Sequence, residues 1–361
     1  MKVAVVHDWL VTNAGAEKVL KSILSLYKDA DLFSIVDFLD DKDRNEILNN
    51  KKVTTSFIQK LPFAKKYFRN YLPLFPKAIE SFNLSSYDLI ISSSWAFAKG
   101  VKKQKNQTHI CYCHTPIRYA WDMYDEYTKN LKQPKKFFVQ KSLKSIKEWD
   151  RQNSENVDFF IANSFFVADR IFKSYGRESK VIYPPVDVER FSLYEKKEEF
   201  YLTASRLVSY KKTNLIVDAF NKMPDKKLIV IGDGEEYKKL KSMAHKNITL
   251  LGSVDDEKLL YYMQRAKAFV YAAIEDFGIV PIEALSCGTP VISLNQGGTK
   301  ESIKEFCGVH FQNQTVYDII KAVLEFEKKE FDLKKISNYA KSFSDKRFLK
   351  EFRKFVQECY G

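Results

Sequence analysis

The sequence predicts an α/β protein made of two doubly wound units in series. Its 361 residues are too many for one ordinary core, and the length favours two domains. Short apolar runs that resemble strands alternate with helix-like runs in both halves, which is typical of parallel sheets covered on both faces. Pro184 and Pro185 form a rigid, extended dipeptide between the halves, and we place the domain boundary there.

Composition indicates a folded protein with an anionic partner. Hydrophobic residues make up 45% of the chain, and the net charge of +13 would suit nucleic acid, anionic lipid or an anionic substrate. Residues 1–10 read as a buried strand rather than a signal peptide, and no apolar run is long enough to span a bilayer. Five cysteines without a CxxC pair suggest reduced thiols. We therefore expect a cytoplasmic protein, either soluble or attached to a membrane surface.

In the first half, strands are expected at 2–7, 31–36, 52–58, 88–94, 109–114 and 157–164. The first strand leads through Gly15 into an amphipathic helix, which is how doubly wound folds begin. Gly15 would either bring the backbone close to a ligand or only let strand and helix pack, and both interpretations stay open.

Segment 60–79 interleaves aromatic residues with lysine and arginine. This mixture suits the headgroup layer of an anionic membrane. A helix that packs on its own sheet and exposes its lysines is the alternative, with about equal support. Nucleic acid is disfavoured, because no RNA-binding signature accompanies the charge.

Two further stretches, 91–101 and 111–124, follow the ends of successive strands, where open α/β sheets bind ligands. His114 lies in the second stretch, CYCHTPIRYAWDMY, and Asp122 could line an acceptor pocket. From position alone, a histidine at a strand end is more often structural than functional.

The second half repeats the pattern, with strands expected at 200–207, 227–234, 248–254, 268–278 and 290–298. Arg206 and Lys211 follow the first of these strands, where their charges could neutralise a diphosphate or simply face solvent. The GDG sequence at 232–234 lacks the third glycine of a dinucleotide fingerprint and is interpreted as a turn.

The stretch EDFGIVPIEALSCGTPVIS, 275–293, places two carboxylates, Glu275 and Glu283, around the start of a short helix. Pro281 suits the first helical position and Gly288 the position after the helix. The unpaired N–H groups at such a helix start attract phosphate. Acceptor side chains beside an anion site suit a nucleotide-sugar.

These motifs resemble those of the retaining glycosyltransferases of the GT-B fold, of the group 1 (family 4) type. The resemblance rests on the E-x7-E pattern of Glu275 and Glu283, on CHTPIRYAWD and on SRLVSYK. It implies two Rossmann-like domains that face each other across a cleft. The N-terminal domain, 1–184, would bind the acceptor, and the C-terminal domain, 185–341, would bind the nucleotide-sugar. The terminal helix, 342–361, would pack back on the first domain.

The resemblance also implies roles for individual residues. His114 would contact the transferred sugar, Glu275 would hold sugar hydroxyls, and Glu283 would hold the ribose. Arg206 and Lys211, with Lys212 as the alternative lysine, would neutralise the leaving diphosphate, and Trp95 is not expected to be catalytic. The catalytic set is His114, Arg206, Lys211 and Glu275, and the donor-binding set is Gly15, Gly252, Phe277, Gly278, Ile279, Val280 and Glu283.

The function expected from this resemblance is transfer of a hexose, with mannose favoured and GDP-mannose as the leading donor. A glycan or polyprenyl-diphosphate-linked acceptor of cell-surface polysaccharide or lipopolysaccharide synthesis is expected, at the inner face of the cytoplasmic membrane. No metal and no cofactor are expected. Two alternatives stay open: a sugar-nucleotide epimerase, which would form product without an acceptor, and a non-catalytic subunit that binds nucleotide or membrane.

Overall fold

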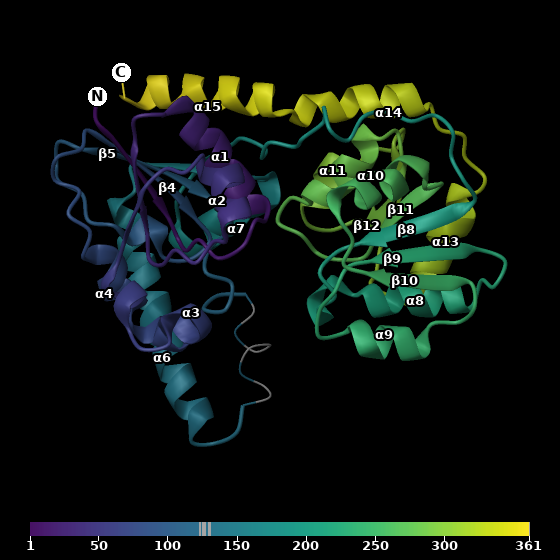
Figure 1. Cartoon of the computed structure of the whole chain (residues 1–361), viewed down its shortest axis with the longest axis horizontal. Coiled ribbons are helices and arrows are strands. Elements are labelled where there is room, and N and C mark those ends of the chain that lie inside the picture. Colours follow the sequence, from purple (N-terminus) through teal and green to yellow (C-terminus); the bar gives the residue numbers. More distant parts are fainter. Residues whose placement is uncertain (123, 125–127, 129–130, 361) are drawn as a thin grey trace. The chain divides into compact units, whose positions relative to one another are not determined.

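The computed structural model describes residues 1–122, 124, 128 and 131–360 (Figure 1). The chain divides into two compact units. The first is Met1–Tyr183 together with Phe348–Gly361, and the second is Pro184–Arg347. Each unit is described by itself below.

The first unit contains a parallel sheet, seven-stranded over the described residues, in the order β3-β2-β1-β4-β5-β6-β7. Its strands are β1 (Val3–His7), β2 (Asp31–Ser34), β3 (Val53–Thr55), β4 (Leu89–Ser94), β5 (Thr108–Cys113), β6 (Phe159–Ala162) and β7 (Ser179–Val181). The winding reverses direction between β1 and β4, which pair with each other. Ligands of open α/β sheets bind beyond the carboxyl ends of the strands at such a switch point.

The helices of the first unit lie on both faces of this sheet. The α-helices are α1 (Gly15–Leu26), α2 (Asp41–Leu48), α3 (Ala64–Tyr67), α4 (Phe75–Glu80), α6 (Lys135–Asn153), α7 (Phe165–Tyr175) and α15 (Asp345–Tyr360). Short 3-10 helices are η1 (Phe57–Lys60), η2 (Phe68–Leu74), η3 (Ala98–Gly100) and η4 (Ser154–Asn156).

Side chains of each strand alternate between the two faces, so each face has its own core. Val5 of β1 belongs to a core shared with α1, α2 and α15, in which Phe348 and Phe352 are fully buried. Val6 belongs to the opposite core, shared with η1, η2, α4 and α6. The C-terminal helix α15 therefore covers the same face as α1 (Figure 1).

The second unit contains a second parallel sheet, with six described strands in the order β10-β9-β8-β11-β12-β13. Its strands are β8 (Phe200–Ala204), β9 (Lys227–Ile231), β10 (Ile248–Gly252), β11 (Ala268–Tyr271), β12 (Val291–Leu294) and β13 (Gly308–Phe311). The winding reverses between β8 and β11, which are paired neighbours.

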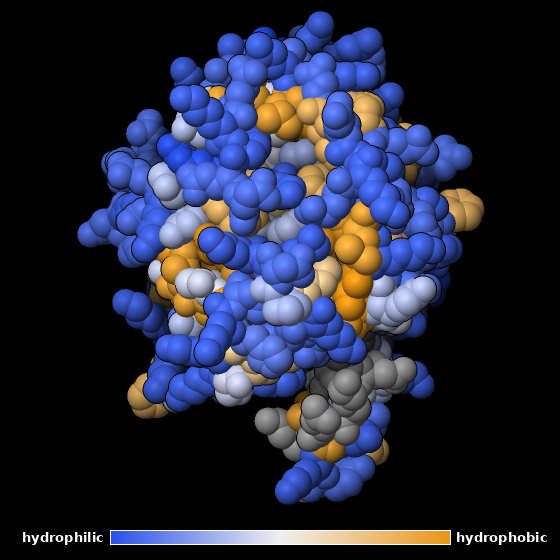
Figure 2. Space-filling view, turned by 90° about the vertical axis from the view of Figure 1, so that its right-hand side faces the viewer, coloured by the Kyte–Doolittle hydropathy of each residue, from blue (hydrophilic) through white to orange (hydrophobic). Residues whose placement is uncertain are grey.

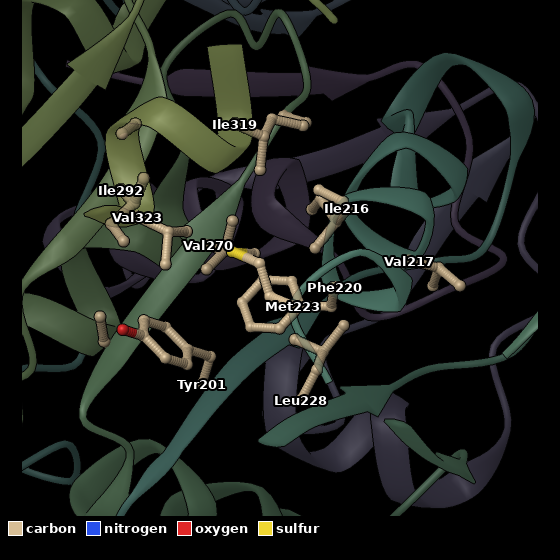
Figure 3. Close-up of a cluster of buried hydrophobic side chains, with 14 of the residues drawn as sticks. Tyr201, Ile216, Val217, Phe220, Met223, Leu228, Val270, Ile292, Ile319 and Val323 are labelled. Atoms are coloured by element: carbon tan, nitrogen blue, oxygen red, sulfur yellow. The ribbon is translucent and has the colours of Figure 1, made fainter. Parts of the chain in front are cut away.

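One core of the second unit lies between this sheet and the helices α8 and α13 (Figure 3). Phe220 of α8 and Val323 of α13 meet Tyr201 and Val270 of the sheet there. The helices are α8 (Thr213–Asn221), α9 (Tyr237–Met243), α10 (Asp256–Arg265), α11 (Ile279–Ser286), α12 (Gly298–Ser302), α13 (Val316–Phe326) and α14 (Leu333–Ala340), with 3-10 helices η5 (Ser209–Lys211) and η6 (Lys341–Phe343). Helix α11 packs against β11, β12 and α14.

The sequence-based strand assignments were wrong in two respects. Strands β7 and β13 were not predicted, because both are very short edge strands without a clear apolar pattern. The predicted strands 268–278 and 290–298 were too long, since β11 ends at Tyr271 and β12 at Leu294. The residues that follow these strands form loops at the carboxyl edge, where the candidate site lies.

The surface is mostly hydrophilic on the face in Figure 2, with hydrophobic residues in small patches. Over the part of the chain that the structure describes, no helix combines the length and the apolar character needed to cross a membrane. Segment 60–79 divides its aromatic residues, because Phe68 and Phe75 are buried in the core while Phe63 is 80% exposed and Tyr67 45% exposed. The alternative that the segment packs on its own sheet therefore holds for Phe68 and Phe75, but not for Phe63 and Tyr67.

Candidate functional site

The carboxyl edge of the second sheet carries three of the residues predicted for catalysis. Arg206 and Lys211 follow β8, and Glu275 follows β11. Because β8 and β11 are neighbours at the switch point, the fold brings Lys211 and Glu275 together although they lie 64 residues apart in the chain. This is the position at which doubly wound sheets bind ligands.

Lys211, Tyr271 and Glu275 form a hydrogen-bonded cluster at this edge. The Lys211 ammonium forms an ion pair with Oε1 of Glu275 and lies 3.3 Å from the Tyr271 hydroxyl. Tyr271 in turn donates to the same carboxylate oxygen at 3.0 Å. Sequence reasoning missed Tyr271, because a tyrosine at the end of an apolar strand is indistinguishable from a core residue.

Burial and charge act in opposite directions on Lys211. Burial alone would lower the pKa of Lys211, but its interactions with Tyr271 and Glu275 outweigh burial and raise that pKa. Burial also raises the pKa of Tyr271, and the Glu275 charge adds to the effect. Lys211 therefore remains a cation, and Tyr271 keeps its proton, at physiological pH.

The cluster retains hydrogen-bonding capacity for a ligand. An ammonium group has three N–H donors, and Tyr271 and Glu275 engage only two of them. Both contacts to Glu275 use Oε1, and Oε2 accepts no hydrogen bond from the described residues. One cationic donor and one anionic acceptor thus lie side by side, which suits a ligand that carries both phosphate and hydroxyl groups.

Arg206 is an exposed cation on a loop with a fixed backbone. Among the described residues its guanidinium has no ion-pair partner, so its donors are available to an anion. The Leu207 N–H donates to Asp233 O at 2.8 Å, which ties this loop to the GDG turn. A Cβ on Gly234 would lie 2.4 Å from the carbonyl oxygen of Leu207, so only glycine permits this approach. The interpretation of 232–234 as a turn agrees with this geometry.

Helix α11 begins with an open N-terminus beside Glu275. Its N-cap is Gly278, at φ +90°, which has no side chain to cap the first N–H groups. The helix starts at Ile279, so the prediction of Pro281 as the first helical residue was wrong by two positions. Proline fits because no N–H in the first turn has a helical partner. Gly288 follows the helix in the left-handed conformation, as predicted.

The other predicted donor-binding residues differ in their accessibility. Phe277 is 3% exposed and its ring packs 5.7 Å from that of Phe343, while Glu283, within α11, is also 3% exposed. Val280, in the first turn of α11, is partly exposed. Gly252 ends β10 at φ +72°, and its carbonyl accepts the Gly232 N–H at 2.9 Å.

A second glycine loop supports the loop that carries Glu275. The Gly298 N–H donates to the backbone oxygen of Glu275 at 2.8 Å, and Gly297 adopts φ +71°. A Cβ on Gly298 would lie 2.4 Å from Cα of Phe277. The GG pair therefore lets the two loops pack backbone against backbone, which fixes the position of Glu275.

In the first unit, His114 follows β5 and joins a buried chain of polar side chains. Its Nε2 lies 2.8 Å from Ser93 Oγ, and that hydroxyl lies 3.1 Å from Nδ1 of His7. His7 Nε2 lies 3.7 Å from a carboxylate oxygen of Glu17. His114 is 8% exposed, and the other three side chains are buried.

Asp8, which the sequence did not single out, fixes the loop after β4. Its carboxylate accepts the backbone N–H groups of four successive residues, at 2.6 Å from Trp95, 2.9 Å from Ala96, 2.5 Å from Phe97 and 2.6 Å from Ala98. Burial raises the pKa of Asp8, against the lowering effect of His7 and of these hydrogen bonds. Trp95 packs with its ring 4.8 Å from His7 and 5.9 Å from His114.

The remaining predictions for the first unit concern Gly15 and Asp122. Gly15 is the first residue of α1, after the N-cap Ala14. Asp122 forms ion pairs with Arg170 at 2.8 Å and with Arg118 at 3.5 Å, so its carboxylate is already engaged. Within the described ranges, no three His, Cys, Asp or Glu side chains are grouped as a metal site would need.

Burial of two histidines predicts acid sensitivity of the first unit. Burial, followed by the charge of His7, lowers the pKa of His114 to about 3, and burial lowers the pKa of His109 to about 4. Because these folded-state values lie below the unfolded value of about 6.5, the unfolded state binds more protons and stability falls as pH falls through this window. Each histidine should cost about 2 kcal/mol of unfolding free energy between pH 7 and pH 5.

Urea unfolding followed by tryptophan fluorescence tests this prediction, because all four tryptophans lie in the first unit. The variant His114→Gln should lose about 2 kcal/mol of the difference between pH 7 and pH 5. An unchanged difference in that variant would contradict the assignment of His114 as a neutral, buried imidazole.

Comparison with known proteins identifies the class. The structure is similar to that of Anabaena HepE in complex with UDP-glucose, with a TM-score of 0.70, 17% identity, and coverage of 99% of this chain and 100% of that one. Together with the two parallel sheets, this similarity defines the fold as GT-B, the fold of a large class of glycosyltransferases.

The family follows from models that match both halves. The Glycosyltransferase Family 4 model matches residues 29–190, and the Glycosyl transferases group 1 model matches residues 186–343. The chain belongs to the group 1, family 4 glycosyltransferases.

Two curated relatives match this chain over only part of their length. An uncharacterized glycosyltransferase of Methanocaldococcus jannaschii is 28% identical over 198 residues, which are 53% of this chain and 56% of the relative. A GDP-mannose-dependent monoacylated alpha-(1-6)-phosphatidylinositol monomannoside mannosyltransferase of Corynebacterium glutamicum is 26% identical over 206 residues, 48% of this chain and 54% of the relative. The chain thus spans about half the length of the curated relatives it matches.

Proposed function

We propose that this protein is a retaining glycosyltransferase that transfers a hexose from a nucleotide-diphospho-sugar. The cluster of Lys211, Tyr271 and Glu275 at the switch point of the second sheet carries this proposal. It presents a permanent cation and a carboxylate oxygen side by side, as a sugar diphosphate requires. The family supports the same reaction class.

In the proposed reaction the bond between the sugar C1 and the diphosphate oxygen breaks, and its electron pair leaves with the diphosphate. Lys211, Arg206 and the open N-terminus of α11 stabilise the charge that develops there. Oε2 of Glu275 accepts a hydrogen bond from a sugar hydroxyl. The acceptor hydroxyl attacks C1 on the face that the diphosphate leaves, and its proton passes to the departing phosphate. The role of His114 as a contact of the transferred sugar stays a prediction.

We propose GDP-mannose as the donor, supported by the GDP-mannose-dependent relative. UDP-glucose is the ligand of a structural neighbour and is therefore the competing donor. Because the protein supplies its own cations, transfer should proceed without a divalent metal ion, and activity that EDTA abolishes would contradict this part of the proposal.

Thermal unfolding with GDP and with UDP tests the donor site. A nucleotide at about 100 times its dissociation constant should stabilise the protein by roughly 2.7 kcal/mol. GDP should stabilise the wild type, and the variant Arg206→Ala should bind it more weakly, whereas Lys300→Ala, an exposed lysine on α12, serves as control. Stabilisation by UDP alone would replace GDP-mannose with a uridine nucleotide-sugar. If neither nucleotide stabilises the protein, the proposed donor site is wrong.

We further propose a glycan or polyprenyl-diphosphate-linked acceptor of cell-surface polysaccharide synthesis, reached at the inner face of the cytoplasmic membrane. The support is the exposed part of segment 60–79, where Phe63 and Tyr67 protrude beside the exposed residues Lys65 and Lys66. Aromatic side chains among lysines suit an anionic headgroup layer.

Co-sedimentation with anionic vesicles tests this contact. The double variant Phe63→Ser/Lys66→Ser should bind vesicles of phosphatidylglycerol and phosphatidylcholine several-fold more weakly than the wild type, since each lysine near such a surface contributes about 1 kcal/mol. The matched variant Tyr317→Ser/Lys321→Ser changes an aromatic residue and a lysine on α13 and should bind normally. Equal binding by both variants would exclude this segment as the membrane contact.

A further inference from the structure

His114 is linked to Glu17 through two buried side chains from different elements. Glu17 lies in the first turn of α1, His7 ends β1, Ser93 lies in β4, and His114 follows β5. The sheet order places β1 beside β4 and β4 beside β5, so the chain of contacts crosses three neighbouring strands.

The single hydroxyl proton of Ser93 couples the tautomers of the two imidazoles, His7 and His114. Ser93 has one hydroxyl proton and lies within hydrogen-bond distance of both Nδ1 of His7 and Nε2 of His114. Ser93 can donate to one ring only, so when it donates to Nδ1 of His7 it can only accept from Nε2 of His114. An unprotonated Nδ1 on His7 therefore requires a proton on Nε2 of His114.

Glu17 determines the state of His7. One carboxylate oxygen of Glu17 accepts the Ala14 N–H at 3.0 Å, and the other lies 3.7 Å from Nε2 of His7. A carboxylate favours a proton on the nitrogen that faces it. In neutral His7 the proton then lies on Nε2, and Nδ1 accepts from Ser93.

Other groups around His7 leave this arrangement undisturbed. The adjacent Asp8 directs its carboxylate to four backbone N–H groups. Trp95 also contacts His7, and the two rings form a T-shaped pair with centroids 4.8 Å apart and an interplanar angle of 71°. Glu17 is therefore the charged side chain that faces Nε2.

We propose that Glu17, His7 and Ser93 are positioning residues that hold the proton of His114 on Nε2 and leave its Nδ1 as a hydrogen-bond acceptor. Among the described residues the His114 ring forms its hydrogen bond through Nε2, so Nδ1 is the nitrogen that a ligand can use. A hydroxyl group would donate to it, whereas a carbonyl or carboxylate oxygen would find no proton there. The identity of that hydroxyl as one of the transferred sugar rests on the proposed function.

Histidine-selective 15N NMR at pH 8 measures this arrangement without any substrate, because protonated and unprotonated ring nitrogens differ strongly in chemical shift. Among the five histidines, the signals of His114 are assigned as those that disappear from the spectrum of His114→Gln. We expect wild-type His114 to carry its proton on Nε2. A wild-type spectrum with the proton on Nδ1 would overturn the proposal.

Glu17→Gln is the decisive variant. Glutamine keeps the acceptor for the Ala14 N–H and therefore the helix cap. Its NH2 group would then face Nε2 of His7, which favours a proton on Nδ1 and leaves the Ser93 hydroxyl able to donate to Nε2 of His114. The ratio of the two His114 tautomers should shift about tenfold toward Nδ1–H, since the carboxylate charge that favours a proton on Nε2 of His7 is removed. No shift would refute the coupling.

The variant Ser93→Ala distinguishes coupling through the Ser93 hydroxyl from a general structural effect of Glu17→Gln. In that background Glu17→Gln should leave the tautomer of His114 unchanged, and a shift that persists would overturn the role of Ser93.

Transfer activity then tests whether His114 contacts the transferred sugar. If Glu17→Gln shifts the tautomer and lowers kcat/KM for transfer but leaves nucleotide affinity unchanged, both the coupling and the sugar contact are supported. A shifted tautomer with unchanged transfer supports the coupling and contradicts His114 as the sugar contact.

Discussion

The variant Lys211→Met should lose about 10²–10³-fold in turnover while the protein stays folded. Lys211 is the cation that lies within the cluster, and its raised pKa keeps it charged over the whole physiological range. Removing a preorganised donor that stabilises a developing negative charge typically has an effect of this size. Methionine retains most of the aliphatic volume, so packing against Tyr271 is largely preserved. Turnover under saturating donor and nucleotide affinity are the two quantities to measure.

Lys212→Met is the matched control, because it makes the same chemical change one residue away. Lys212 is the N-cap of α8, at φ +56°, and it takes no part in the cluster with Glu275. We expect it to retain turnover within a few-fold. If Lys212→Met loses turnover and Lys211→Met does not, the two lysines have been assigned the wrong way round.

The sequence identified Lys211 and Glu275 separately, but not their contact. Motif resemblance located both residues after strands, and the strand–helix alternation predicted the doubly wound units. Their ion pair depends on the pairing of β8 with β11, which a sequence pattern along the chain does not contain. Tyr271 could not be predicted for the same reason, since its hydroxyl gains its partners only when the two strand ends meet.

The first unit extends this reasoning to residues that carry no motif at all. His7 ends the first strand and Asp8 follows it, and neither residue belongs to a recognisable motif. Their contacts depend on β4 lying beside β1, which places four backbone N–H groups around Asp8 and Ser93 next to His7. His114 was identified only by resemblance, and its link to Glu17 required the sheet order. Local pattern therefore predicts which edge of a sheet is functional, while the partners across strands require the topology.

The buried ion pair between Lys99 and Asp150 should be essential for the stability of the first unit. Lys99 Nζ lies 2.6 Å from Oδ1 of Asp150, and both side chains are 0% exposed. The other carboxylate oxygen accepts from the Trp121 indole at 2.8 Å and from the Tyr175 hydroxyl at 2.7 Å. Burial alone would lower the pKa of Lys99, but the charge of Asp150 outweighs it and raises that pKa.

Lys99→Met should lower the unfolding free energy of the first unit by about 3–5 kcal/mol, because it leaves the Asp150 charge buried without its cation. Tryptophan fluorescence in urea measures this unit alone, since every tryptophan lies in it. The control Lys102→Met removes a lysine that pairs with Glu80 at 3.2 Å but is 68% exposed, and it should change stability by less than about 0.5 kcal/mol. Adding Asp150→Asn to Lys99→Met should restore part of the loss, since the buried charge is gone. If the double variant is as unstable as the sum of both single variants, the loss arises from packing, and the ion pair is not its cause.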